Sequence, residues 1–227
     1  MAVTTLILCA HRTLTIETFV SILATTNRPG WSLLIECGDA LISRSRSIAV
    51  SRWLRELPDE DSFLMVDDDF LFTAEDADAV VNLAIDKQGI SAGVVPLRSG
   101  DFTTIVPLGG RMSEEPWLDP EYPPTEIKWA GGFLAYHRSV FEKMTFTLPL
   151  LHKGEPTLPS FWPFFMPTIY DNGGGRGIYL SEDYAMHQRA RDLGFTVWVQ
   201  PKAQIGHVAN LTVTPSRMQY ARGLVGK

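Results

Sequence analysis

The stretch FLMVDDD, residues Phe63–Asp69, decides the fold, because four apolar residues run directly into three consecutive carboxylates. A short, continuous apolar run is typical of a central parallel strand that is covered on both faces. Ligands of open α/β sheets bind outside the carboxyl ends of the strands, so we expect these acids to lie at a ligand site. Side chains alternate along an extended chain, which puts Asp67 and Asp69 on one side and Asp68 on the other.

Three neighbouring carboxylates repel one another unless a cation lies between them. Hard divalent ions such as Mg²⁺ and Mn²⁺ take carboxylate oxygens as ligands, so the triplet indicates a metal site. The alternative is a solvated acidic turn in front of a helix, because acids are also favoured near helix N-termini.

Strand and helix patterns alternate around this stretch. The residues before it predict strand Thr5–Cys9, a helix from Ile16, strand Leu33–Glu36 and a helix from Asp39 to Leu57; those after it predict a helix from Thr73 to Gly89 and strand Ala92–Val95. The first of these helices has apolar residues at helical spacing, which predicts that they face the core: Ile16, Phe19, Val20, Leu23 and Ala24. The alternation predicts an α/β fold with a mostly parallel central sheet flanked by helices.

The second half of the chain has a different character. Eleven of the fifteen prolines lie between Pro96 and Pro167, so long loops are expected there. The elements predicted within and after these loops are a strand-like segment Ile127–Tyr136, a helix Ser139–Met144, a helix Ser181–Leu193, and strands Thr196–Val199 and Gln204–Val208.

The composition is that of a globular protein. The 227 residues are 45% apolar and 20% charged, which excludes a disordered chain, a collagen-like chain and a coiled coil. No apolar stretch approaches the ~20 residues of a membrane-spanning helix, and Met1–His11 lacks the basic n-region of a signal peptide. We therefore expect no membrane insertion and a cytoplasmic protein. Cys9 and Cys37 lie in strand-like apolar runs, which favours buried reduced thiols and leaves a disulfide between them open.

The charges are unevenly distributed. The formal net charge of -6 argues against a surface coated in positive charge for nucleic acid. However, Ala40–Arg55 carries four arginines and Leu193–Lys227 carries four basic residues, each without an acid, whereas Ser113–Glu126 carries five acids and no base. We expect an anionic ligand to bind beside the basic segments.

Two further acids, Glu182 and Asp183, follow Ser181 at the start of a predicted helix, shortly after the glycine-rich loop Asp171–Gly177. Ser181 as N-cap with two acids in the first turn is favourable helix chemistry in itself. A carboxylate at the mouth of a glycine loop also fits a general base that takes the proton of an acceptor hydroxyl. Both interpretations stay open on the residues alone.

Arg46 and His207 complete the candidate residues. Arg46 falls on the apolar side of its predicted helix, where a guanidinium needs either a phosphate or a buried carboxylate as its partner. His207 stands in a strand-like segment without acids, where a packed, hydrogen-bonded histidine is the common arrangement. The upstream carboxylates favour the other interpretation, a metal ligand.

Five elements in order resemble the GT-A fold glycosyltransferases, and in particular small stand-alone members of glycosyltransferase family 2 of the type found in bacteriophages. They are Leu41–Arg46, Phe63–Asp69, Trp129–Tyr136, Ser181–Asp183 and Gly206–His207. The resemblance implies metal-dependent transfer of a sugar, with inversion, from a nucleotide-diphosphate sugar to an acceptor hydroxyl. It implies a single Rossmann-like GT-A domain over residues 1–227, with a nucleotide-binding half (1–95), an acceptor and metal half (96–208) and a basic C-terminal tail (209–227).

The same resemblance implies roles for individual residues. Asp69 and His207 match ligands of Mn²⁺ or Mg²⁺, and Asp67 matches either a further metal ligand or a contact to the donor's ribose or sugar. Asp183 matches the general base, with Glu182 beside it as a second catalytic candidate. The donor site would further include His11, Arg12, Glu36, Arg46, Asp68, Gly131 and Gly132. The metal would stabilise the charge on the leaving diphosphate while the base takes the acceptor's proton.

The acceptor and the rival functions are less constrained. Phage transferases that resemble this family modify hydroxymethylated pyrimidines in DNA, so phage DNA in the host cytoplasm is one expected acceptor, and a glycan or small molecule is the alternative. Trp162, Phe164 and Phe165 either stack on a sugar or a flipped base or form a packed aromatic loop. The rival functions are a phosphohydrolase similar to the haloacid dehalogenases, whose nucleophilic Asp also follows an apolar strand, and a non-catalytic sugar-nucleotide binder.

Overall fold

The computed structural model describes residues 4–10, 13–98, 102–109, 115–154, 160–171, 173 and 175–208. Its central sheet contains β1 (Thr4–Ala10), β2 (Trp31–Cys37), β3 (Ser62–Val66), β5 (Ile90–Val94), β6 (Val106–Pro107), β7 (Thr125–Trp129), β8 (Leu134–His137) and β13 (Val197–Gln204). These eight strands are ordered β2-β1-β3-β8-β5-β13-β7-β6. Strands β8 and β7 run against the common direction of the others. The predicted α/β fold with a helix-flanked central sheet is confirmed; six of the eight strands share one direction, and the two reversed strands make the sheet mixed.

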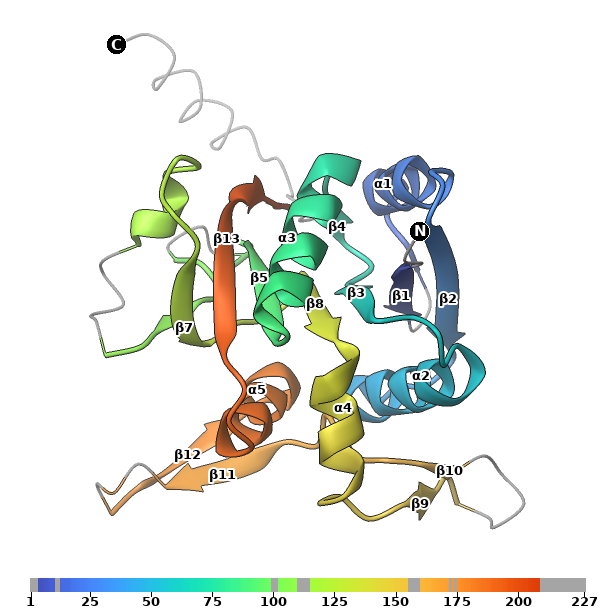
Figure 1. Ribbon diagram of the computed structural model, residues 1–227, viewed down its shortest axis with the longest axis vertical. Helices are drawn as coiled ribbons and strands as arrows, with labels where there is room; N and C mark the ends of the chain where they lie inside the picture. Colours follow the sequence, from blue (N-terminus) through green and yellow to red (C-terminus); the bar gives the residue numbers. More distant parts are fainter. Residues whose placement is uncertain are drawn as a thin grey trace, which may run out of the picture.

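Helices cover both faces of this sheet, as Figure 1 shows. They are α1 (Ile16–Thr26), α2 (Ile42–Glu56), α3 (Ala74–Lys87), α4 (Arg138–Thr145) and α5 (Glu182–Asp192). Helices α1 and α3 lie on one side, and α2, α4 and α5 lie in a row on the other. Strand β3 is fully buried between these layers: Phe63 and Met65 enter the core under α2, α4 and α5, and Leu64 and Val66 enter the core under α1 and α3.

An aromatic cluster fills the core beneath α2 and α4. The ring of Phe63 lies 4.8 Å from that of Trp53 and 5.3 Å from that of Phe141, measured between centroids. Phe164 and Phe165 are fully buried in the same core. The proline-flanked aromatic residues therefore form a packed loop, and the alternative in which these two stack on a ligand is wrong.

Helix α1 is where the sequence predicts it, but its orientation is the reverse of the prediction. Ile16, Phe19, Val20 and Leu23 are exposed, while the buried residues are Thr18, Ser21, Ile22 and Thr25. The hydroxyl groups of the buried face have partners: the Ser21 hydroxyl accepts from Phe72 N at 3.1 Å, the Thr25 hydroxyl donates to Ser21 O at 2.9 Å, and the Thr18 hydroxyl bonds to that of Thr15 at 2.6 Å. Because these hydroxyl groups have hydrogen-bond partners, this face of the helix can lie in the core, although the pattern of apolar residues predicts that it faces solvent.

The strand-like segment Ile127–Tyr136 is two strands, β7 and β8, that are not neighbours in the sheet. The chain turns between them at Gly132, which has a φ of +94°. A Cβ at this position would lie 2.7 Å from the ring of Phe70, so only glycine fits. A continuous strand here was therefore a wrong prediction.

Smaller features agree with the sequence in part. Thr73 and Asp76 form the predicted capping box at the start of α3. Both thiols are free; Cys9 is buried as predicted, but Cys37 is exposed on the edge strand β2. Burial raises the pKa of the Cys9 thiol to about 12, so it stays protonated. Among the described residues, none of the helices has the length and apolarity needed to cross a membrane.

The orientation of α1 predicts different costs for the same substitution at two of its positions. Ile22 is 3% exposed and Ile16 is 67% exposed. We expect Ile22→Ala to lower the free energy of unfolding by about 2–5 kcal/mol, and Ile16→Ala to change it by less than about 0.5 kcal/mol. Urea denaturation of both variants measures this difference, and a larger loss for Ile16→Ala would mean that the helix is turned the other way.

Candidate functional site

The carboxyl ends of three parallel strands meet at one edge of the sheet. Asp67–Asp69 follows β3, Pro96–Arg98 follows β5, and Gly206–His207, which forms the short strand β14, follows β13. β14 pairs antiparallel with β4 (Phe70–Leu71), in a register that sets His207 opposite Phe70. This pairing brings His207 next to Asp69, 138 residues away in the sequence.

The first cluster of charged side chains at this edge, the Arg46 cluster, consists of Arg46 with Asp67, Glu182 and Asp183. Arg46 projects from α2 and is 2% exposed. Its Nη2 donates to Asp67 Oδ1 at 2.5 Å, its Nη1 donates to Asp183 Oδ1, and Glu182 Oε1 lies 3.5 Å from the same Nη1. Of the two partners expected for this arginine, the structure shows the buried carboxylate.

The charges in the Arg46 cluster do not balance, since three carboxylates share one guanidinium. Burial alone would lower the pKa of Arg46, but the charges of Asp183, Asp67 and Glu182 raise it well above its ordinary value. Burial raises the pKa of Asp67 above that of a free aspartate, against the opposing effect of Arg46. Burial, and then the charge of Asp183, raise the pKa of Glu182. The cluster therefore favours protons and cations.

Asp183 connects this cluster to the glycine turn. Its Oδ2 accepts a hydrogen bond from the backbone N–H of Gly132 at 3.2 Å. A Cβ at Gly131 would lie 3.5 Å from the same oxygen, which is an ordinary contact, so glycine is not required there. Thr104 Oγ1 donates to Gly131 O at 2.8 Å, and Tyr184 OH donates to Thr104 O at 2.8 Å, which fixes the turn from its other side.

His187 was missed in the sequence, although it follows Asp183 by one helical turn of α5. It is fully buried, and its Nδ1 accepts from the backbone N–H of Ala130 at 3.1 Å. Burial, helped by the charge of Arg46, lowers the pKa of His187 to about 3, so the ring is neutral at physiological pH. It supports the turn without adding charge to the site.

The second cluster is the Asp69–His207 pair. The Nε2 atom of His207 lies 3.2 Å from Asp69 Oδ2, and its Nδ1 lies 2.9 Å from the carbonyl oxygen of Pro96. That carbonyl only accepts hydrogen bonds, so Nδ1 carries the proton and Nε2 is left as an acceptor beside Asp69. A histidine held in this way through its other nitrogen is typical of metal ligands. Arg98 Nε also lies 3.0 Å from this Nε2, and Arg98 Nη2 donates to Asp69.

The donor set of this pair fits a divalent cation with two protein ligands. Within the described residues, no group of three or more His, Cys, Asp or Glu converges on one point. An imidazole nitrogen and a carboxylate oxygen suit Mn²⁺, and the other coordination positions would be left to oxygens of a ligand and to water.

The remaining predicted residues lie beside these clusters, pair elsewhere, or fall outside the described ranges. Glu36 pairs with Arg52 at 3.2 Å, and Asp68 is half-buried with a pKa raised by burial and by the charges of Asp69 and Asp67. Asp39, which precedes α2, accepts hydrogen bonds from Arg44 Nε and Nη2 at 2.7 and 2.8 Å. His11, Arg12 and the basic tail 209–227 lie outside the described residues.

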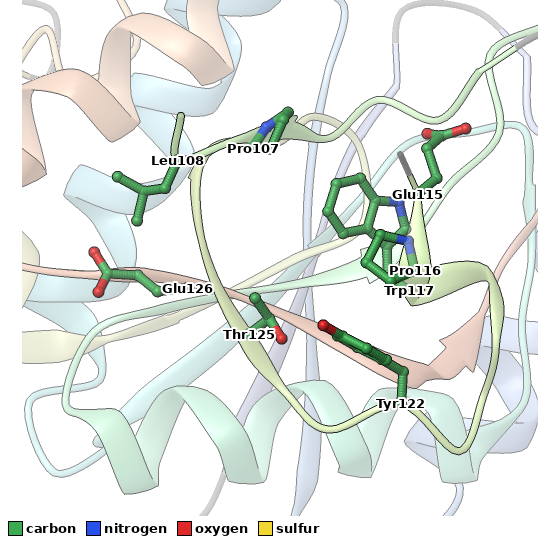
Figure 2. Close-up of a pocket in the computed structure, with 8 residues that line it drawn as sticks. All are labelled: Pro107, Leu108, Glu115, Pro116, Trp117, Tyr122, Thr125 and Glu126. Atoms are coloured by element: carbon green, nitrogen blue, oxygen red, sulfur yellow. The ribbon is translucent and has the colours of Figure 1, made fainter. Parts of the chain in front are cut away.

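A pocket of about 690 Å³ lies between β6, β7 and the short helix η1 (Pro116–Leu118). Figure 2 shows its lining, which includes the aromatic rings of Trp117 and Tyr122 and the carboxylates of Glu115 and Glu126. Glu115 accepts hydrogen bonds from Thr103, the residue before Thr104 of the glycine turn. The pocket is thus aromatic and acidic, and it is connected to the site through neighbouring residues of one loop.

Comparison with known proteins supports the fold. No family model matches the chain, and no curated protein matches it in sequence. The solved structure of A197 from STIV aligns with 95% of this chain and 91% of its own at a TM-score of 0.61 and 15% identity. GalNAc-T7, solved with UDP, GalNAc and Mn²⁺, aligns with 99% of this chain and 48% of its own at a TM-score of 0.51 and 12% identity. This chain spans about half the length of GalNAc-T7 and has a GT-A-like fold.

The Arg46 cluster predicts a pH-dependent cost for loss of its cation. Arg46→Gln leaves three carboxylates unpaired, and we expect it to lower the free energy of unfolding by about 3–5 kcal/mol at neutral pH. The pKa values of Asp67 and Glu182 are already raised in the folded state and rise further without the guanidinium. As the pH falls, the folded variant therefore takes up protons before the unfolded chain does. Its loss of free energy of unfolding, relative to the parent, becomes smaller as the pH falls toward about 5.

Arg52→Gln, in the same helix, is the matched control. Arg52 is 38% exposed and pairs with Glu36 and Glu56 at the surface, so its loss should cost at most about 1 kcal/mol at any pH. Urea denaturation at several pH values compares the two variants. An Arg46→Gln deficit that equals the control, or that grows on acidification, would contradict the described ion pairing.

Proposed function

We propose that this protein is a metal-dependent glycosyltransferase that moves a sugar from a nucleotide-diphosphate sugar to an acceptor hydroxyl, with inversion at the anomeric carbon. The observation that carries the proposal is the convergence of the Asp69–His207 pair and the Arg46 cluster at the carboxyl end of β3 in a GT-A-like fold. One cluster suits a cation with its diphosphate, and the other supplies a carboxylate to an acceptor.

On the donor side, Asp69 and His207 would hold Mn²⁺ or Mg²⁺. The metal, when bound, stabilises the charge that develops on the leaving diphosphate. Asp67 receives a hydrogen bond from Arg46. We assign Asp67 to bind a hydroxyl of the ribose or sugar of the nucleotide sugar. A carboxylate that accepts from one guanidinium nitrogen can still accept a hydrogen bond from such a hydroxyl. Arg46 is a positioning residue in this scheme, since its buried guanidinium holds the two acids.

On the acceptor side, Asp183 is the proposed general base. Its Oδ1 is bonded to Arg46, whereas its Oδ2 accepts one hydrogen bond, from Gly132 N. The second acceptor position on Oδ2 is where the hydroxyl proton of the acceptor would go as its oxygen attacks the anomeric carbon. Glu182 sits beside it with a more exposed side chain, 24% against 8%, and would orient the acceptor.

Charge favours a neutral acceptor. The pocket between β6, β7 and η1 carries the carboxylates of Glu115 and Glu126, the second of them paired with Arg191 at 3.2 Å, and these carboxylates disfavour a polyanion there. A glycan or a small hydroxyl compound therefore fits the described surface better than a hydroxymethylated pyrimidine in DNA. The support for DNA is the basic composition of residues 209–227.

The proposed base predicts a loss of turnover without a loss of donor binding. We expect Asp183→Asn to lower kcat by about 10²–10⁴-fold and to leave the Kd of the nucleotide donor within about twofold of the parent, because binding needs no proton transfer. Release of nucleoside diphosphate from UDP-, GDP-, CDP- and dTDP-sugars with Mn²⁺ measures turnover, and calorimetry measures binding. Asp192→Asn, at the other end of α5, is the control that should change neither.

Two results would count against this assignment. Parental turnover in Asp183→Asn would remove Asp183 as the base. Release of inorganic phosphate instead of nucleoside diphosphate would favour the phosphohydrolase, and binding without any release in the parent protein would favour the non-catalytic binder.

A further inference from the structure

Arg98 makes contacts that the proposed function does not use. Its side chain extends from the loop after β5 and is 68% exposed. Its Nη2 donates to Asp69 Oδ2, and its Nε donates to His207 Nε2 at 3.0 Å. One guanidinium thus bonds to both members of the Asp69–His207 pair, through the same two atoms that face each other at 3.2 Å.

These two atoms need a positive group between them. With the Nδ1 proton of His207 donated to Pro96 O, its Nε2 is an acceptor, and the Asp69 oxygen that it faces is also an acceptor. A proton on Nε2 would not relieve this, because it would then face the Arg98 Nε–H at 3.0 Å, donor against donor. The fork of Arg98 satisfies both lone pairs at once.

A divalent cation would use the same lone pairs. Two ligands that lie about 2.1 Å from one ion at a right angle are about 3.0 Å apart, close to the observed 3.2 Å between Asp69 Oδ2 and His207 Nε2. The one lone pair of His207 Nε2 accepts from Arg98 Nε, so a metal cannot bind both atoms of the pair while Arg98 is in place. The other described cations of the site do not reach it: Arg46 is committed to Asp67 and Asp183.

We propose that Arg98 and the divalent cation compete for the Asp69–His207 pair, so that metal binding displaces the Arg98 side chain. The inference rests on the proposed function for the metal site, but it concerns how this chain holds that site before the metal arrives. Arg98 is suited to be displaced, because an exposed ion pair is weak and its side chain can turn into solvent without uncovering the core. The bound guanidinium keeps the two ligands aligned and lowers their apparent affinity for metal.

Mn²⁺ titration of the nucleotide-free protein, followed by the electron paramagnetic resonance signal of free Mn²⁺, tests this competition. We expect Arg98→Ala to bind Mn²⁺ about fivefold more tightly than the parent, because an exposed ion pair no longer has to be broken. Arg28→Ala is the matched control: it removes the same charge from a surface pair with Asp78, and it should leave the Kd unchanged. Adding Asp69→Asn to Arg98→Ala should abolish the gain.

The outcomes separate the inference from the function it rests on. If the parent binds Mn²⁺ and Arg98→Ala binds it equally or more weakly, the competition is overturned but the metal site is supported. Absence of Mn²⁺ binding in both proteins would overturn the competition and the proposed metal site together. The titration uses no nucleotide sugar and measures no turnover. If the protein fails to transfer a sugar, the results on the metal site and on the competition with Arg98 are therefore unaffected.

Discussion

The buried guanidinium of Arg46 holds together parts of the chain that are far apart in sequence. It lies in α2 and bonds to Asp67, 21 residues later at the end of β3, and to Asp183, 137 residues later at the start of α5. Three carboxylates in this position would repel one another and lose their hydration without a cation among them. The same contact therefore joins two helices to the central strand and fixes the position of Asp67 relative to Asp183.

The site as a whole carries more carboxylates than internal cations. Arg46 pairs with Asp67, Glu182 and Asp183. Arg98 pairs with Asp69 and donates a hydrogen bond to His207. Incomplete neutralisation costs stability in the free protein, as the raised pKa values of Asp67 and Glu182 indicate. Such strain is common where a site is prepared for a ligand that brings the missing charge. Arg46 is buried and fixed, whereas Arg98 is exposed and replaceable, so the two arginines have different functions in one ion network.

Much of the fold follows from local patterns, and the site follows only in part. The apolar run Phe63–Val66 predicts a strand that is buried on both faces, and the three acids that follow it predict a ligand site at the carboxyl end of that strand. A continuous apolar run of this length is typical of few other elements. Helix α1 shows the limit of this reasoning, since Ser21 and Thr25 enter the core on hydrogen bonds that no hydrophobic pattern records. The partners of Arg46 depend on tertiary contacts across 137 residues. Arg98 belongs to no sequence motif. Its position just after a predicted parallel strand was the feature that could have placed it at the ligand end of the sheet.

The proposed function requires that this sheet edge bind a nucleoside diphosphate through a divalent cation. Thermal unfolding with UDP, GDP, CDP and dTDP, each with and without Mn²⁺, tests it most directly, because a ligand of the native state alone adds RT ln(1 + [L]/Kd), about 2.7 kcal/mol at a hundredfold excess over Kd. We expect one nucleotide to raise Tm, and only when Mn²⁺ is present. No shift with any nucleotide in the presence of Mn²⁺ would contradict it.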